Sequence, residues 1–338
     1  MRRKDKLRPE AEAWSLLLAA PYVHLAAVTA DGRPLMRAIH VARHDGGLVL
    51  HGARLGDKVE ALSGRVVVCA ERVVAEIPSH FTHAERACPA TTFFRSAMLH
   101  GTVRELTHPA DKAPALQALM QRHQPQGGYR PITAEDPFYT ASIDGVRVWH
   151  IVPDKVVAKA GLGSSKPVEW KRRALRGLWR LGQVDGVREL AEAWALSPWD
   201  SPQDGLSIIL PDDNRAPEAA ALLVGHYWTT HRSNAQLEAQ QRGSTAWVGA
   251  EDADGQLIAT ARAVSDGARF AWVLDVAVAA DHRGRGIGRA VMEVLLDHPA
   301  LRSCQSVGLR TRDAGPFYAS LGFEQQTGAT HPTWVRAT

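Results

Sequence analysis

The residues best suited to chemistry are concentrated in a glycine-rich stretch from His282 to Arg289, which reads His-Arg-Gly-Arg-Gly-Ile-Gly-Arg. Alternating apolar residues predict a strand over 270–278 just before it, and a helix with one apolar face is predicted just after it. A turn at the start of a helix presents unpaired backbone N–H groups, and the helix dipole adds positive potential there. Glycines let an anion reach that backbone. The stretch therefore predicts a phosphate-binding loop.

The spacing of the glycines indicates which class of phosphate-containing ligand the loop would bind. No Lys-Ser/Thr pair follows the last glycine, so the stretch is not a P-loop, and the third glycine of a dinucleotide motif is replaced by Arg289. The pattern that fits is Arg-x-x-Gly-x-Gly at Arg283, Gly286 and Gly288. It resembles the acetyl-CoA pyrophosphate loop of the GNAT superfamily of N-acetyltransferases. A glycine-rich turn without a ligand is the alternative.

A second segment, 313–323, reads Asp-Ala-Gly-Pro-Phe-Tyr-Ala-Ser-Leu-Gly-Phe and resembles the second signature of the same superfamily. The resemblance covers about residues 206–326. It implies an α/β acyltransferase fold with a mixed, mostly antiparallel sheet, and acetyl-CoA bound through the end of the signature strand and the phosphate loop. The cofactor-binding residues that it implies are Val276, Ala277, Val278, Arg283, Gly284, Arg285, Gly286, Ile287, Gly288 and Arg289.

Acyl transfer from a thioester to an amine needs a donor for the carbonyl oxyanion and a proton for the leaving thiolate. Tyr318 is placed like the tyrosine that protonates the thiolate in this superfamily, and a core aromatic residue is the alternative interpretation. The pair Tyr227-Trp228 resembles residues on the acceptor side of some relatives.

The general base is not chosen by the sequence. Asp275 lies in the middle of the predicted strand and is our candidate, either to accept the amine proton through a water molecule or to bind a cationic amine. His226 and Glu251 are weaker candidates.

The N-terminal half has a different character. Short strands separated by turns such as Asp31-Gly32 and 44–47 favour a small antiparallel barrel. The runs GRPLMRAIHVARHDGGLVLHGARLGDKVEAL and ACPATTFFRSAMLHGTVREL resemble the FMN-binding split barrels of the pyridoxamine 5′-phosphate oxidase-like superfamily, in particular its nitroimidazole-reductase-like branch. The resemblance covers about residues 8–165. The C-terminal arginines that bind substrate in true pyridoxamine phosphate oxidases are absent, so that reaction is not expected.

The flavin that the resemblance implies, FMN, carries a phosphate that needs cationic and N–H donors. We expect Lys58 and Arg95 to converge on this phosphate at the barrel rim, although each side chain alone is equally typical of an exposed surface residue. The resemblance also implies that His51 and Gly52 lie along the isoalloxazine ring. The full set of predicted flavin-binding residues is Arg37, His51, Gly52, Lys58, Arg95 and Ser96.

Composition limits the remaining possibilities. The chain has 338 residues, enough for two domains, and a net charge of +4, which suits small anions and is weak evidence for nucleic acid. The three cysteines form no C-x-x-C pair, and His80, His83 and Cys88 lack a fourth ligand, so neither a disulfide framework nor a metal site is expected. No apolar run approaches the roughly 20 residues of a membrane helix, and no signal peptide is recognisable. We therefore expect a cytoplasmic protein without a membrane partner.

These observations predict an FMN-binding split-barrel domain over 1–165, a helical linker over 166–204 and a GNAT acetyltransferase domain over 205–338. The linker contains a basic amphipathic helix at 166–180, which could bind nucleic acid or a membrane; we favour its packing on its own domain. The function predicted is a bifunctional fusion of a reductase- or oxidase-like flavoprotein and an N-acetyltransferase acting on a small amine. The alternative is a sensor or sequestering protein in which one or both sites are silent. A homodimer through the barrel is also expected.

Overall fold

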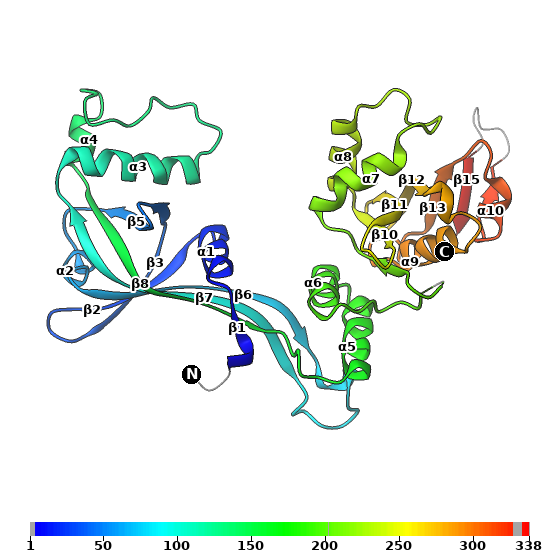
Figure 1. Cartoon of the computed structure of the whole chain (residues 1–338), viewed down its shortest axis with the longest axis horizontal. Helices are drawn as coiled ribbons and strands as arrows, with labels where there is room; N and C mark the ends of the chain where they lie inside the picture. The colour runs from blue at the N-terminus through cyan, green and yellow to red at the C-terminus, as the bar shows by residue number, and fades with distance from the viewer. Residues whose placement is uncertain (1–3, 202, 327–332, 338) are drawn as a thin grey trace. The chain divides into compact units, whose positions relative to one another are not determined.

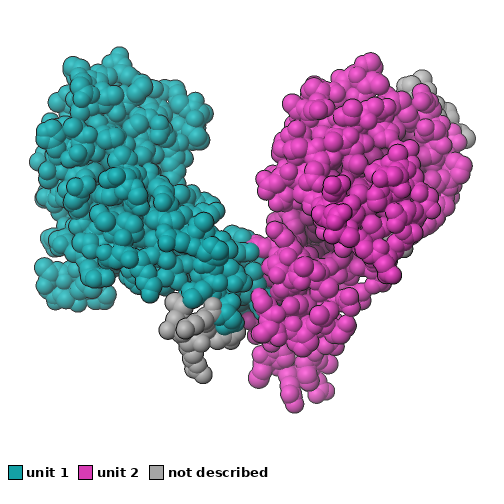
Figure 2. Space-filling view, in the orientation of Figure 1, with its two compact units in different colours: residues 1–74, 92–163 teal, residues 75–91, 164–338 magenta. Residues whose placement is uncertain are grey.

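The computed structural model describes residues 4–201, 203–326 and 333–337, which form two compact units (Figure 2). The first unit comprises the residues up to Val74 together with Thr92–Gly163. The second comprises Ala75–Thr91 together with the residues from Ser164 onward. The second unit therefore includes a short segment that lies, in sequence, inside the first.

The first unit is built on an antiparallel sheet that curls into half of a barrel (Figure 1). Its strands follow the order β3-β2-β6-β7-β8-β5-β4, with β1 paired to β8, and this arrangement confirms the predicted split-barrel fold. The strands are β1 (Leu7–Arg8), β2 (Val23–Val28), β3 (Pro34–Ile39), β4 (Ala42–His44), β5 (Gly47–Gly52), β6 (Arg65–Ile77), β7 (Thr91–Leu106) and β8 (Arg147–Gly161).

Helices cover the curled sheet because alternate strand residues are apolar and need a partner. Leu25 and Trp149 of the strands and Leu17 of α1 are buried in one core. Arg122 of α3 donates to the carbonyl oxygens of Leu18 (2.9 Å) and Ala20 (2.6 Å), which closes the C-terminus of α1. The helices of this unit are α1 (Glu10–Ala19), α2 (Asp57–Ala61), α3 (Pro109–His123) and α4 (Thr140–Asp144).

The second unit contains a mixed sheet with the order β14-β15-β13-β12-β11-β10-β9. Its pairs are antiparallel except that β12 and β13 run parallel, as the predicted α/β fold requires. The strands are β9 (Ser207–Ile209), β10 (Ala246–Glu251), β11 (Leu257–Ser265), β12 (Phe270–Val278), β13 (Ser306–Arg310), β14 (Glu324–Gln325) and β15 (Thr333–Ala337).

Helices pack on both faces of this sheet (Figure 1). Ala277 of β12 is buried against α7 (Ala216–Leu223) and α8 (Asn234–Arg242). The next residue, Val278, points to the other face and approaches α9 (Ile287–Leu296). A capping box of Ser233 and Gln236 begins α8. A short helix, α10 (Gly315–Ala319), follows β13.

The predicted basic helix forms α5 (Val168–Arg180), and α6 (Val184–Trp194) follows it. The apolar face of α5 is buried, as expected: Leu178 is inaccessible and the indole of Trp179 donates to Asp297 (2.6 Å). A Cβ on Gly177 would overlap with the ring of Phe81, which lies between β6 and β7. A glycine inside a helix costs about 1 kcal/mol relative to alanine, and here it makes room for that ring.

Within the described ranges, no helix has the length and apolar character that crossing a bilayer demands.

Candidate active site

Two parallel strands of the second unit separate part-way along their length. β12 pairs with β13 only from Phe270 to Trp272, opposite Ser306 to Gly308. Beyond that point β13 continues beside β15, and β12 has no ladder partner in β13 among the described residues. The backbone edge of β12 from Val273 onward therefore faces an opening between the strands, where its N–H and C=O groups are available to a ligand.

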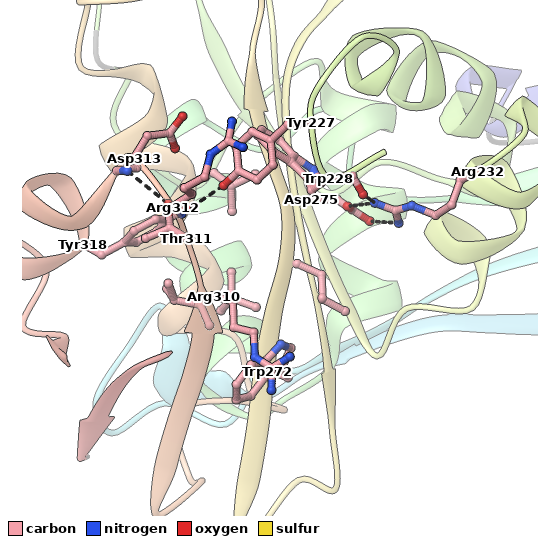
Figure 3. A pocket seen from close by; sticks show the side chains of 15 residues that line it. Tyr227, Trp228, Arg232, Trp272, Asp275, Arg310, Thr311, Arg312, Asp313 and Tyr318 are labelled. Atoms are coloured by element: carbon pink, nitrogen blue, oxygen red, sulfur yellow. Dashed lines mark hydrogen bonds and ion pairs between the residues drawn. The ribbon is translucent and has the colours of Figure 1, made fainter. Parts of the chain in front are cut away.

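A pocket of about 680 Å³ occupies this opening (Figure 3). β12 and the end of β13 form its walls, and the loop between α7 and α8 contributes aromatic side chains. The residues that line it are Tyr227, Trp228, Arg232, Trp272, Val273, Leu274, Asp275, Val276, Leu309, Arg310, Thr311, Arg312, Asp313, Ala314 and Tyr318.

Asp275 interrupts the regular pleat of β12. Thr260 of β11 pairs with Ala277 and Arg262 pairs with Leu274, so one residue of β11 faces two residues of β12. This count defines a β-bulge. Asp275 has φ +52°, in the left-handed region that few residues other than glycine adopt. The bulge turns the backbone of β12 at the point where it begins to line the pocket.

Buried ion pairs hold Asp275 in this conformation. Its carboxylate accepts from Arg262 Nε (2.7 Å). It also accepts from both terminal nitrogens of Arg232 (2.9 and 3.1 Å) (Figure 3). Burial raises the pKa of Asp275, but the two guanidinium groups outweigh it and lower the pKa below its ordinary value. A carboxylate held in its charged form by two arginines is a poor proton acceptor, so these contacts favour a positioning role for Asp275 over both roles that the sequence left open, the base and the binding of a cationic amine.

Tyr318 is the other predicted catalytic residue. It comes from α10, lines the pocket and is 8% exposed. Burial, with smaller effects of Tyr227 and Asp313, raises the pKa of its hydroxyl to about 12, so this hydroxyl carries a proton at neutral pH. The rings of Phe317 and Phe323 pack against it edge-on. Tyr318 is thus both a packed aromatic residue and a protonated hydroxyl at a pocket.

The glycine-rich stretch forms the turn before α9. Gly284 (φ +72°) and Gly286 (φ +78°) adopt left-handed conformations, and a Cβ built on either would meet nothing within 4 Å. Gly286 is the N-cap of α9, and no side chain in the described part of the chain caps this end. The first N–H groups of α9, from Ile287 to Arg289, are therefore free to bind an anion, which fits a pyrophosphate.

In the first unit, three of the predicted flavin residues lie together. The ammonium of Lys58 donates to the carbonyl oxygen of His51 (3.2 Å), and a Cβ on Gly52 would lie only 2.5 Å from the Lys58 nitrogen. α2, which carries Lys58, also packs on β3, the strand that carries Arg37. Burial lowers the pKa of Lys58; burial, then Lys58 and His40, lower the pKa of His51. An anion bound here would relieve this accumulation of positive charge, so the residues fit a phosphate.

The other two predicted flavin residues lie elsewhere. Gly52 pairs with Arg147 at the start of β8, whereas Arg95 pairs with Ala160 near its end. At about 3.3 Å per residue, nearly the whole length of β8, about 40 Å of extended chain, separates them. The prediction that Lys58 and Arg95 converge on one phosphate is therefore wrong within a single chain. Arg95 instead forms an ion pair with Glu12 (2.8 Å).

Comparison with protein families agrees with this geometry in both units. Residues 9–160 match the family model described as pyridoxamine 5′-phosphate oxidase, and residues 242–325 match the model described as the acetyltransferase (GNAT) domain. The chain joins an oxidase-like domain to a GNAT domain. No curated protein matches it.

Solved structures similar to the chain cover one domain each. For the oxidase-like domain they include a proposed 5-nitroimidazole antibiotic resistance protein from Bacteroides thetaiotaomicron, with 19% identity and TM-score 0.37 over 46% of this chain and 86% of that one. They also include an FAD- and haem-binding protein from Mycobacterium smegmatis, with 23% identity and TM-score 0.37 over 46% and 73%. For the GNAT domain, a proposed GNAT-family acetyltransferase from Xanthomonas campestris has 29% identity and TM-score 0.32 over 36% and 86%.

The arginine side chains of the GNAT domain's glycine-rich loop bind protein groups. Arg283 donates to the carbonyl oxygen of Val278 (3.0 Å), Arg285 to Gln203 (2.7 Å) and Arg289 to Ser320 (2.6 Å). These contacts fix the loop against its neighbours.

The weaker candidates for the base lie outside the lining of the pocket. Glu251 forms an ion pair with Arg215 (3.1 Å), and the ring of His226 stacks on Trp228, with 4.3 Å between centroids. Tyr227 and Trp228 do line the pocket.

Sequence reasoning missed several residues of the pocket. Arg310 is the last residue of β13 and Arg312 lies two positions later, and Trp272 lies on the neighbouring strand β12. The parallel pairing of β12 and β13 brings them together, and no local sequence pattern predicts that pairing. The only signal was the position of Arg310 and Arg312 between the strand and the second signature.

Proposed function

We propose that the chain is an acetyl-CoA-dependent N-acetyltransferase that acts on a small amine, joined to a flavin-binding domain of the reductase or oxidase type. The main structural support for the proposed acetyltransferase activity is the separation of β12 from β13. It opens a pocket that the protonated hydroxyl of Tyr318 helps to line, and the uncapped start of α9 follows the end of β12.

Each group in this arrangement has a role in acyl transfer. Acetyl-CoA supplies an acyl group activated as a thioester. The N–H groups at the start of α9 bind its pyrophosphate, and the free edge of β12 orients the pantetheine arm and the carbonyl oxygen. Tyr318 gives its proton to the sulfur that leaves as a thiolate. Asp275, tied to Arg232 and Arg262, holds the bulge that aims the edge of β12 and acts as a positioning residue.

The amine proton has no dedicated acceptor among these groups. With Asp275 engaged by two arginines, we propose that the amine reaches the pocket uncharged and releases its proton to water after attack.

We propose that the oxidase-like domain binds FMN, with the cluster of His51, Gly52 and Lys58 at the flavin and Arg37 beside it. Lys58 and Arg95 contact one phosphate only if they come from two chains, because β8 separates them within one chain. The expected homodimer through the barrel would supply both. A purified protein with flavin absorbance and the mass of a dimer supports this assignment, and a colourless monomer contradicts it.

A substitution in the glycine-rich loop tests the transferase. Gly286→Val puts a branched side chain at φ +78°, where the N–H groups of α9 begin. Gly255→Val is the matched control, because Gly255 has φ +77° in an exposed turn and also meets nothing within 4 Å. We expect Gly286→Val to weaken acetyl-CoA binding at least tenfold by calorimetry, and Gly255→Val to leave it unchanged. Equal effects of the two variants would show that backbone strain, not a phosphate site, is responsible.

The flavin content of the same variant tests whether the flavin site and the acetyl-CoA site are independent. Because the loop and the Lys58 cluster belong to different units, Gly286→Val should keep the flavin of the unmodified protein. If flavin and acetyl-CoA binding were lost together, the two sites would not be independent.

A further inference from the structure

The pocket beside β12 holds more guanidinium groups than carboxylates. Arg232, Arg310 and Arg312 line it, together with the carboxylates of Asp275 and Asp313. Asp275 is already shared between Arg232 and Arg262, the second of which approaches from β11. One of the two carboxylates of the pocket, that of Asp275, is therefore already engaged in holding the bulge.

Two of these arginines are placed by aromatic rings. Arg310 lies over the ring of Trp272 (5.8 Å to the centroid) and Arg312 over the ring of Tyr227 (3.9 Å) (Figure 3). A Cβ on Gly308 would overlap with the indole of Trp272, so this glycine lets the ring lie across β13 in front of Arg310. Stacking fixes the plane of a guanidinium group and leaves its N–H edges available.

Neither arginine has an acidic partner in the described part of the chain. The ion pairs there join other arginines to carboxylates, and none involves Arg310 or Arg312. Arginines that are stacked but not neutralised, at a concave site, are typical of carboxylate or phosphate recognition.

A third donor lies in the same pocket. The indole N–H of Trp228 is buried and has no hydrogen-bond partner among the described residues. Leaving a buried donor unsatisfied is unfavourable, and a ligand oxygen would satisfy it. Apart from the carboxylate of Asp313, the groups described here are donors, and the ligand that complements them carries acceptor oxygens.

We propose that the acyl acceptor is an amine that also carries an anionic group, a carboxylate or a phosphate, held by Arg310 and Arg312. The proposal rests on the proposed acetyl transfer and names the class of acceptor. The anion neutralises the two arginines, and the rings of Trp272 and Tyr227 pack against the carbon atoms between the anion and the amine. The cationic wall also disfavours the protonated ammonium form of the amine, which cannot attack.

Pairs of amines that differ only in the anion test this. Tyrosine and tyramine differ in a carboxylate, and phosphoethanolamine and ethanolamine differ in a phosphate. Acetylation rates, followed by the release of CoA thiol, should be about ten- to a hundredfold higher in kcat/KM for the anionic member of at least one pair, as a charge-assisted contact predicts. The pair that shows the difference identifies the anion.

Substitutions of Arg310 and Arg312 test whether these two residues cause the preference for the anionic amine. In the double variant Arg310→Gln with Arg312→Gln, the preference for the anionic amine should disappear while acetyl-CoA affinity stays unchanged. Arg310→Lys with Arg312→Lys should recover part of the preference. Arg269→Gln is the matched control, because Arg269 also stacks on an aromatic ring, that of Phe270 (4.9 Å), but does not line the pocket.

A binding measurement keeps the test independent of turnover. In the presence of CoA, 3-(4-hydroxyphenyl)propionate, a carboxylate without an amine, and inorganic phosphate should change the tryptophan fluorescence of the unmodified protein, and 4-ethylphenol should bind at least tenfold more weakly than the carboxylate. Equal binding of the acid and the phenol, together with no response to phosphate, overturns the proposal. A loss of acetyl-CoA affinity in the double variant also overturns it, by assigning the arginines to the cofactor. A protein that never binds acetyl-CoA refutes the proposed acetyl transfer itself.

Discussion

Asp275 and Arg262 form an ion pair across β11 and β12, with 2.7 Å between the carboxylate oxygen and Nε and with both side chains almost inaccessible to solvent. Arg232 approaches the same carboxylate from the segment before α8. Three elements are thus tied together at the residue where β12 leaves its regular pleat. The open edge of β12 is therefore built into the fold before any ligand arrives.

Asp275→Asn should destabilise the GNAT domain by about 3–5 kcal/mol, because it leaves two arginines without their shared carboxylate. Asp200→Asn is the control: Asp200 also pairs with an arginine, but its side chain is 99% exposed, so the loss should be at most about 1 kcal/mol. Urea unfolding followed by tryptophan fluorescence measures both. A variant as stable as the control whose turnover is nevertheless abolished across the pH range would restore Asp275 as the base.

Tyr318→Phe should lower acetyl transfer by about 10²–10⁴-fold, the usual contribution of a positioned general acid. The ring and its packing against Phe323 remain, so acetyl-CoA affinity should change little. Because the pKa of this hydroxyl is about 12, no loss of rate from its ionisation should be seen up to about pH 10. Single-turnover rates test this, and a variant with full activity would leave Tyr318 as a core aromatic residue only.

Mixing two inactive variants tests the shared flavin site. Lys58→Ala and Arg95→Ala should each weaken FMN binding by about ten- to a hundredfold. If each site takes one residue from each of two chains, refolding the variants together should restore about a quarter of the sites, since half of the dimers are mixed and each then has one intact site. No recovery would mean that the two residues do not serve one phosphate.

A further variant distinguishes two roles of Arg95, binding of the FMN phosphate and structural support of α1. Arg95 is paired with Glu12, so Glu12→Gln removes the ion pair and keeps the arginine. If Arg95 reads the phosphate, Glu12→Gln should keep FMN binding. If Arg95 only secures α1 to the sheet, Glu12→Gln and Arg95→Ala should be equally harmful.

His298 should make stability depend on pH. It is buried, and burial together with Arg188 and Arg302 lowers its pKa from 6.5 to about 4. The unfolded chain therefore takes up this proton at a higher pH than the folded protein does. The stabilisation is complete above pH 6.5, falls as the pH drops towards 4, and amounts to roughly 3 kcal/mol.

His298→Asn should flatten this dependence between pH 4 and 6.5, because an amide takes up no proton in this range. The amide oxygen can still accept the hydrogen bond that Ala300 donates to the ring, so the local fold is kept. His231→Asn, at an exposed position, should leave the dependence as it is. Melting temperatures at several pH values provide the measurement, and identical curves for the two variants would refute the assignment.

Local sequence patterns were sufficient for much of the fold. The glycine spacing from Arg283 to Gly288 predicted the turn before α9, because this feature is decided within one helical turn. Tyr318 was found through a short signature of the same kind.

Features that depend on pairing between distant strands were not accessible in this way. The bulge at Asp275 is invisible in the alternation of apolar residues, since it is defined by what β11 places opposite. The separation of Lys58 from Arg95 follows from the register of β8 with two other strands. Arg310 and Arg312 belong to the pocket only because β13 runs parallel to β12.

The contact between Phe81 and Gly177 bears on how such a fusion can be taken apart. The oxidase-like match covers one continuous range, 9–160, and Phe81 lies inside it. Phe81 nevertheless packs with the second compact unit. A gene shortened to encode the acetyltransferase half from α5 onward would lack Phe81. The surface of α5 at Gly177, which the ring of Phe81 covers, would then be exposed. The segment around Phe81 therefore has to accompany the second unit if that unit is to keep its packing at α5.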